Sequence, residues 1–129
     1  MAREVTTLKQ IEQGRATYAF KAVQAVSTSL QKEYKSAAKK LPVLIKTNGL
    51  GQSLAFIKKR NSSYDKLYEQ IGEWLQTEDT KRLVEEGELV EQVIKLDSHA
   101  YRQVTVETLA LLNWMRRFVD SLIEGEGDN

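Results

Sequence analysis

Lysine side chains at helical spacing are the residues of this sequence best suited to do chemistry. Lys32, Lys35 and Lys39 recur three and four residues apart, so one face of a helix would carry all three. Flexible lysines bind the charge of phosphate groups rather than the edges of bases. The pattern therefore predicts contacts with an RNA or DNA backbone that do not read its sequence. The residues expected to contact phosphates are Lys21, Lys32, Lys35, Lys39, Lys40, Lys46, Lys58 and Lys59, with Arg15 and Arg60 as further candidates.

These basic residues also have plainer explanations. A lysine row can be a solvated helix face, and Lys58-Lys59-Arg60 can stabilise the C-terminal end of a helix. Acidic residues are nevertheless scarce here. Residues 1–60 hold twelve basic and three acidic residues, a net charge of +9, whereas residues 61–129 hold seven and fifteen, a net charge of −8. This asymmetry favours a polyanionic partner or self-association between opposite halves, unless helices of the two halves interleave in the fold.

Motifs for catalysis or cofactor binding are not found. The sequence has no phosphate-binding loop, and Gly49-Leu50-Gly51 follows no expected strand, so it is not a dinucleotide fingerprint. Asp97-Ser98-His99 joins three catalytic residue types, but adjacency does not orient a triad, and a helix cap explains the trio. The chain has no cysteine and one histidine, which excludes thiolate chemistry and a histidine-rich metal site. We expect no catalytic residue, no metal and no cofactor.

Length and composition favour one helical domain. The chain has 129 residues, of which 41% are hydrophobic and 29% charged. No run reaches the ~18 apolar residues of a membrane span, and residues 1–10 lack the apolar core of a signal peptide, so we expect a cytoplasmic protein without membrane contact. Period-two alternation is absent over any useful length. We therefore predict an all-α fold, a single compact multihelical bundle of about six or seven helices over residues 1–124, with a frayed acidic tail at 125–129.

Apolar spacing and turn residues place the individual helices. Pro42 is expected to open a short helix that Asn48-Gly49 ends, because proline fits the first turn of a helix and glycine its C-terminal cap. The cluster Asn61-Ser62-Ser63, Thr77 and the pair Asp97-Ser98 lie at expected N-caps. Helical spacing is found over residues 4–38 (one helix or two in line), 43–47, 50–60, 64–76, 77–86, 89–96 and 99–123.

Several short runs, taken in order, resemble a known family. The first is Arg15-Ala16-Thr17-Tyr18-Ala19-Phe20, followed by Tyr34-Lys35-Ser36. The most specific are the Leu-Pro, Asn-Gly-Leu-Gly and Leu-Ala-Phe pieces within residues 41–56, and the closing Asn113-Trp114-Met115-Arg116-Arg117-Phe118. From about Arg15 to Glu124 the chain resembles the Cmr small-subunit family, the small helical subunit of the type III-B CRISPR effector, known as the RAMP-module complex.

The resemblance implies a role in antiviral defence. Proteins of this family are non-catalytic structural subunits, all-α and compact. Copies stack head to tail beside the backbone subunits that hold the guide RNA, and line the channel where target RNA pairs with it, while other subunits cleave. The implied partners are the backbone and large Cmr subunits, the guide RNA, the target RNA and further copies of the chain. The motif residues expected to pack the core are Leu41, Pro42, Leu54, Phe56, Trp114 and Phe118, with Gly49 and Gly51 allowing a turn and a close helix contact.

Two other classes of protein stay open. One is a DNA-binding regulator with a helix-turn-helix, in which residues 50–60 form the recognition helix. Its first residues, Leu50, Gly51 and Gln52, offer one base-reading side chain, which is few for this role. The other is a helical protein adaptor without nucleic-acid contact, whose lysines serve solubility. A preference for palindromic duplexes would favour the regulator, and binding that ignores salt and RNA would favour the adaptor.

Overall fold

The computed structural model describes residues 2–80 and 82–124, and within them the side chains of residues 10–78, 80 and 82–124. It confirms the predicted all-α class, because the described residues form helices and no strands. The expected acidic tail at 125–129 lies outside the described residues. The elements are α1 (Ala2–Gln24), η1 (Thr28–Leu30), α2 (Gln31–Asn48), α3 (Leu50–Ile57), α4 (Ser62–Leu75), η2 (Glu78–Thr80), α5 (Leu89–Ile94) and α6 (Ser98–Leu122).

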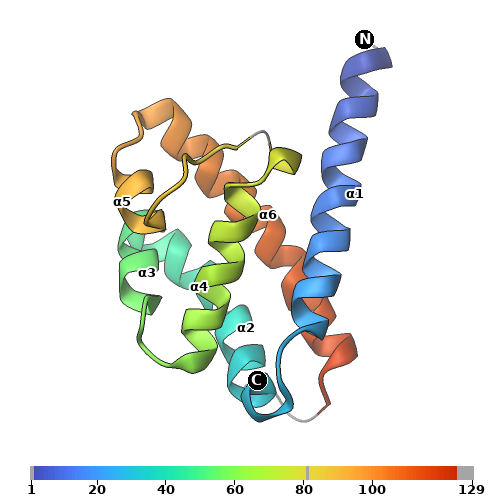
Figure 1. Ribbon diagram of the computed structural model, residues 1–129, viewed down its shortest axis with the longest axis vertical. Helices are drawn as coiled ribbons and strands as arrows, with labels where there is room; N and C mark the ends of the chain where they lie inside the picture. Colours follow the sequence, from blue (N-terminus) through green and yellow to red (C-terminus); the bar gives the residue numbers. More distant parts are fainter. Residues whose placement is uncertain (1, 81, 125–129) are drawn as a thin grey trace.

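Helix α6 packs most extensively against α1 and α2 and more lightly against α4 and α5, while α3 packs on α2, α4 and α5. Helix α6 runs diagonally through the molecule, with α1 along one side and α3, α4 and α5 on the other (Figure 1). Its start is fixed by Asp97, whose carboxylate accepts a hydrogen bond from the amide of Ala100 at 2.8 Å, as the sequence predicted. The inward side chains follow the period of 3.6 residues, which is why the predicted bounds of this helix hold within a residue or two. They are Val104, Thr108, Leu111, Leu112, Met115 and Val119.

A bidentate ion pair joins α1 to α6. The Nε and Nη2 of Arg15 donate to the two carboxylate oxygens of Glu107 at 2.7 and 2.8 Å. The indole Nε1 of the fully buried Trp74, on α4, donates to the same carboxylate at 2.8 Å. The hydrogen bond from Arg15 to Glu107 is the main cause that raises the pKa of Arg15 above its ordinary value. One carboxylate thus connects three helices at a largely buried position.

The first two helices differ from the expected single helix or two in line. Helix α1 ends at Gln24, and the chain turns through η1 and reverses before α2 begins (Figure 1). Residues 25–30 are rich in serine and threonine, which compete with helix hydrogen bonds through their own side chains. The reversal carries α2 back along α6 and α4, so α1 and α2, the first two helices of the basic half, lie on different sides of the bundle.

The prediction that Pro42 opens a new helix is wrong. Pro42 lies inside α2, where it has no amide to donate to the carbonyl of Ala38. Leu41 and Ile45, before and after it, are almost completely buried. Burying such side chains stabilises by about 1.5–3 kcal/mol each, which offsets the roughly 3 kcal/mol that an interior proline costs. The helix therefore continues to Asn48, and Gly49 ends it with a φ of 88°, a positive value that favours glycine.

Helix α3 begins where the motif predicted a close contact. A Cβ on Gly51 would lie 3.3 Å from Cγ2 of Ile94 and 3.4 Å from the hydroxyl of Tyr101. The amide of Gly51 donates to that hydroxyl at 2.8 Å. The absent side chain therefore lets α3 approach α5 and the first turn of α6. Helix α3 ends at Ile57, three residues earlier than predicted, and Lys58-Lys59-Arg60 form a turn instead of its last residues.

The expected helix over 77–86 is also wrong. Only the turn η2 forms, and Arg82 adopts a positive φ of 50° that no helix accommodates. The amide of Val84 then donates to the carbonyl of Leu75, which folds the connection back over the end of α4 and buries Val84 completely. The apolar residues of this segment are too sparse to make a helical stripe, so burial of Val84 decides its path.

Removing the shared carboxylate should destabilise the whole bundle. We expect Glu107→Ala to lower the free energy of unfolding by about 2–4 kcal/mol, because the guanidinium of Arg15 and the indole of Trp74 lose their partner. Urea titration measures this, with Glu12→Ala as the control. Glu12 binds the same arginine at 2.8 Å from an exposed position, so its removal should cost below about 0.5 kcal/mol. Equal destabilisation in the two variants would contradict this role of Glu107.

Candidate nucleic-acid interface

Four of the candidate cations have identified partners within the fold, and Lys40 also interacts within the chain. Lys35 is buried and donates to the backbone carbonyl of Ile123 at 3.1 Å, at the C-terminal end of α6. Lys39 pairs with Asp120 of α6 at 2.8 Å. Lys58 pairs with Glu88 at 2.5 Å, and Arg15 with Glu107 as described above. Although Lys32, Lys35 and Lys39 recur at helical spacing, Lys35 and Lys39 thus hold α2 against α6.

The other candidates lie on the surface. Lys32, Lys40 and Lys46 are exposed on one side of α2, although Lys40 also interacts within the chain. Lys46 lies fourteen positions after Lys32, which corresponds to about 21 Å along the helix axis. Lys21 is exposed on α1, and Lys59 and Arg60 are exposed in the turn between α3 and α4. The structure therefore divides the predicted basic set into a row on α2, one lysine on α1 and a separate turn.

A cleft between α2 and α6 continues the α2 row. It has a volume of about 290 Å³, and two of its lining side chains are the cations Lys46 and Arg116. Its other lining residues are Pro42, Leu109, Ala110 and Asn113, so no carboxylate lines it. Asp120 lies near enough that Arg116 helps to lower its pKa, but its carboxylate is occupied by Lys39. Two cations beside the amide of Asn113 can bind a phosphate group through charge and hydrogen bonds.

Sequence reasoning identified the parts of this cleft without predicting that they meet. Lys46 was a candidate from its charge, whereas Arg116 and Asn113 belonged to the closing motif of the family resemblance. Seventy residues separate Lys46 from Arg116, so helical spacing carries no signal of their proximity. Their positions across the α2–α6 contact bring them together. One lysine from the basic half and one arginine from the acidic half thus serve the same cleft.

The aromatic residues of the motifs differ in their surroundings. Trp114 and Phe118 are half-buried and stack with ring centroids 5.7 Å apart, and Phe20 contacts Phe118 edge-on at 5.4 Å. Tyr34 is fully buried, and burial raises its pKa above the ordinary value. Phe56 was expected in the core, but 45% of its surface is exposed. Phe56 lies on the outer side of α3, because Leu54 and Ile57 take the inward positions.

The run Asp97-Ser98-His99, which joins three catalytic residue types, begins helix α6. Asp97 caps α6, so its carboxylate is not aimed at His99, which is exposed on the first turn. No group of three or more metal-ligating side chains is found within the described residues. In the same part of the chain, no helix is both long and apolar enough to cross a bilayer. For the DNA-regulator alternative, Leu50 and Gly51 at the start of α3 are buried and Gln52 is exposed, so this helix presents one base-reading side chain there.

Comparison with known proteins decides the family. Residues 11–122 match the family described as CRISPR-associated protein (Cas_Cmr5), which covers most of the chain. The chain belongs to the Cmr5 family. A curated relative, the CRISPR system Cmr subunit Cmr5 of Thermus thermophilus, is 36% identical over 96 residues, covering 71% of this chain and 76% of the relative. This confirms the resemblance to the small subunit of the type III-B system that the motifs suggested.

A solved structure agrees with the fold. The crystal structure of a CRISPR-associated Cmr5 family protein from Thermus thermophilus superimposes with a TM-score of 0.75 at 32% identity, covering 88% of this chain and 98% of the other. Both walls of the α2–α6 cleft lie within the residues matched to the Cmr5 family.

The lysines that hold α2 against α6 make a testable contribution to acid stability. The hydrogen bond from Lys39, assisted by the charges of Lys39, Lys35 and Arg116, lowers the pKa of Asp120 below its ordinary value. Because the folded pKa is the lower one, the pair stabilises the fold above the unfolded value of about 3.9. This stabilisation disappears as the pH falls through the folded pKa.

We expect Lys39→Met to raise the pKa of Asp120 toward its ordinary value and to weaken the acid dependence of stability. Carboxyl NMR titration measures the pKa, and urea unfolding at several pH values measures the stability. Lys32→Met removes an exposed lysine from the same helix and should leave the titration of Asp120 unchanged. An Asp120 that titrates alike in the wild type and in Lys39→Met would rule out the pair as the cause.

Proposed function

We propose that this chain is a non-catalytic structural subunit of a type III-B Cmr ribonucleoprotein and binds RNA phosphates through α2 and the α2–α6 cleft. The observation that carries the proposal is the convergence of Lys46 and Arg116 in a cleft without a lining carboxylate. Membership of the Cmr5 family supports the assignment to a Cmr complex, because the relative in Thermus thermophilus is a Cmr subunit. The proposed partners are the backbone and large Cmr subunits, the guide RNA and the target RNA.

The exposed lysines fit contacts with a backbone rather than with bases. Lys32, Lys40 and Lys46 are long, flexible side chains on a solvated helix face, which suits electrostatic contact with phosphates. Each phosphate that they neutralise would release a counterion and make binding more sensitive to salt. A surface of this kind can follow the channel in which guide and target RNA pair, whatever their sequences, while cleavage belongs to other subunits.

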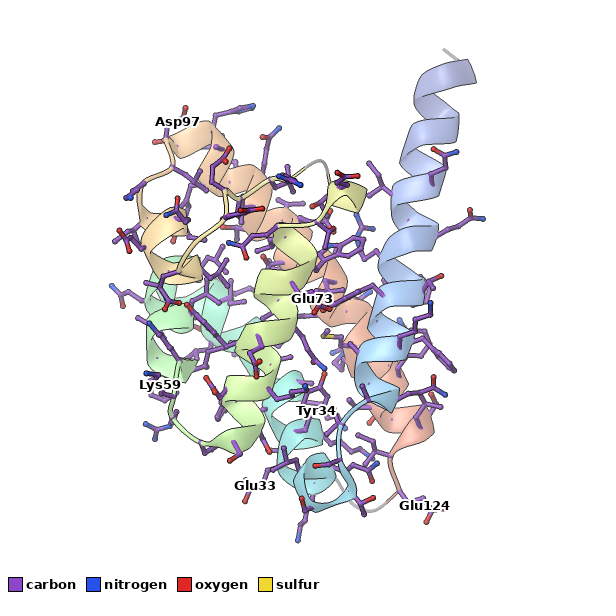
Figure 2. All side chains as sticks on the ribbon, viewed as in Figure 1. Glu33, Tyr34, Lys59, Glu73, Asp97 and Glu124 are labelled. Carbon is purple, nitrogen blue, oxygen red and sulfur yellow. The ribbon has the colours of Figure 1, made fainter. Side chains whose placement is uncertain are left out.

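Head-to-tail stacking of copies is the second part of the proposal. The connection from α4 to α5 and the start of α6 lie at one end of the molecule, and the α1–α2 connection and the α3–α4 turn lie toward the other (Figure 1). Exposed glutamates at the first end include Glu78, Glu85, Glu86 and Glu91, of which Glu78 and Glu86 pair with Arg82 and Glu91 with Lys95. Exposed residues toward the second end carry both signs, among them Lys32, Glu33 and Glu124 (Figure 2). Ion pairs between the charged residues of the two ends would favour a heterologous contact that repeats along a filament.

Reversing the two cations of the cleft should weaken RNA binding by the assembled complex. We expect the pair Lys46→Glu and Arg116→Glu to reduce affinity at moderate salt, and to lower the slope of log affinity against log salt by about 0.7–0.9 for each phosphate that is no longer neutralised. Filter binding across a salt series measures both. Lys66→Glu with Arg102→Glu is the control, because it changes the net charge equally and neither residue lines the cleft. If the complex with the cleft double variant and the complex with the control variant show the same slope of log affinity against log salt, the cleft is not a phosphate site.

Stacking between copies should depend on the acidic end. We expect Glu85→Lys with Glu91→Lys to shift the full chain toward monomer at low salt, because exposed lysines of the next copy then meet like charge. Sedimentation velocity at matched concentrations measures the mean mass. Glu69→Lys, an exposed change on the side of α4, should leave self-association as in the wild type. Self-association that is unchanged by the double variant and by added salt would argue against charge-driven stacking.

A further inference from the structure

The turn between α3 and α4 carries a cation–aromatic pair that the phosphate-binding role does not use. Arg60 lies over the exposed ring of Phe56, with its Cζ 4.3 Å from the ring centroid. Tyr64 contacts the same ring edge-on, with centroids 6.4 Å apart at an interplanar angle of 76°. Lys59 precedes Arg60 in the turn and is also exposed. An exposed planar surface is thus combined with two cationic side chains at one site.

The backbone holds this turn in a defined shape. Lys59 has a φ of 57°, a left-handed conformation that is uncommon for a residue with a side chain. Its amide donates to the carboxylate of Asp65 at 3.2 Å, and the amide of Arg60 donates to the carbonyl of Ile57 at 3.1 Å. Asn61 then caps α4 by accepting from the amide of Tyr64 at 2.9 Å. Local hydrogen bonds therefore fix the turn that presents Lys59 and Arg60.

The charge of the turn points to an anionic ligand. Lys58 is neutralised by Glu88, and Asp65 lies beside the amide of Lys59. Within the described residues, neither Lys59 nor Arg60 forms an ion pair. Figure 2 places Lys59 at the outer edge of the molecule, on the side away from α1. Both cations are therefore available to a ligand that approaches from solvent.

We propose that Phe56, Arg60 and Tyr64 form a stacking site for an unpaired base of single-stranded RNA, with Lys59 on the adjacent phosphate. A nucleotide is both planar and anionic, so a single residue of RNA satisfies the ring, the guanidinium and the ammonium together. A protein partner would have to supply an aromatic ring and a carboxylate from separate side chains. The inference rests on the proposed RNA-binding role and adds a contact to bases, which the α2 row and the cleft do not make.

NMR titration of the full chain tests the site with two probes of equal length. One is a short single-stranded oligoadenosine, and the other is an abasic ribose-phosphate oligomer that carries the charge without the bases. We expect ring-current shifts at the Phe56 ring and the Arg60 Nε–H with oligoadenosine and not with the abasic oligomer. Shifts of equal size with both probes, or none at Phe56, would overturn the proposal.

Two conservative variants separate stacking from charge. Phe56→Leu keeps an apolar side chain, and Arg60→Lys keeps the charge but removes the flat guanidinium. We expect Phe56→Leu to lower affinity for oligoadenosine by about 5- to 100-fold, and Arg60→Lys to lower it in the same direction, each far more than for the abasic oligomer. Lys59→Gln should lower affinity for both probes alike, and Lys95→Gln, on another face, should change neither.

The outcomes distinguish this site from the proposed function. Shifts near Lys46 and Arg116 with both probes, without shifts at Phe56, would overturn the stacking site and leave the phosphate-binding role standing. An absence of shifts at both places would overturn both. Shifts at Phe56 that arise with another Cmr subunit and not with oligoadenosine would overturn base stacking in favour of a protein contact.

Discussion

The carboxylate of Glu107 is the point on which the arrangement of the helices depends. It accepts two hydrogen bonds from Arg15 on α1 and one from Trp74 on α4, at distances of 2.7–2.8 Å. On α1, the hydroxyl of Tyr18 also donates to the carbonyl of Gln70 at 2.8 Å, and the side-chain amide nitrogen of Gln70 donates to the carbonyl of Ala22 at 2.9 Å, so α4 is held to α1 at a second place. Only the bidentate ion pair joins α1 to α6 with a fixed orientation among these contacts, because both nitrogens must meet both oxygens. The pair therefore fixes where α1 crosses α6.

The same helix α6 decides which cations are available to a ligand. Its C-terminal half meets α2, and there Lys35 and Lys39 are used to bind the carbonyl of Ile123 and the carboxylate of Asp120. One turn earlier along α6, Arg116 faces Lys46 across the cleft without a lining carboxylate. The ion pair between Lys39 and Asp120 thus helps to hold α2 against α6, and this contact keeps the like charges of Lys46 and Arg116 on opposite walls of the cleft. Like charges held close by a fold favour an anion between them.

Sequence periodicity predicted what depends on local rules and missed what depends on contact between distant segments. The long helix from Ser98 to Leu122 has both a continuous apolar stripe and a capping aspartate, so its bounds followed from the sequence. Pro42 misled because the burial of Leu41 and Ile45 outweighs the local cost of an interior proline. In the candidate site, charge and spacing found the exposed Lys46 but could not separate it from Lys35, whose burial depends on α6. The exposure of Phe56 could not be predicted either, because a phenylalanine in an apolar run is usually buried.

In the proposed function, the surfaces for RNA and for neighbouring copies use largely different parts of the molecule. The α2 row and the cleft lie along the side of the bundle, whereas the exposed glutamates of residues 78–91 lie at one end. A few lysines per copy give weak binding that salt easily screens. When copies are joined end to end, each further contact forms at high effective concentration, so the array can hold RNA that a single copy would release. A subunit with the proposed function would need no deep pocket, because repetition of the contact would supply the affinity.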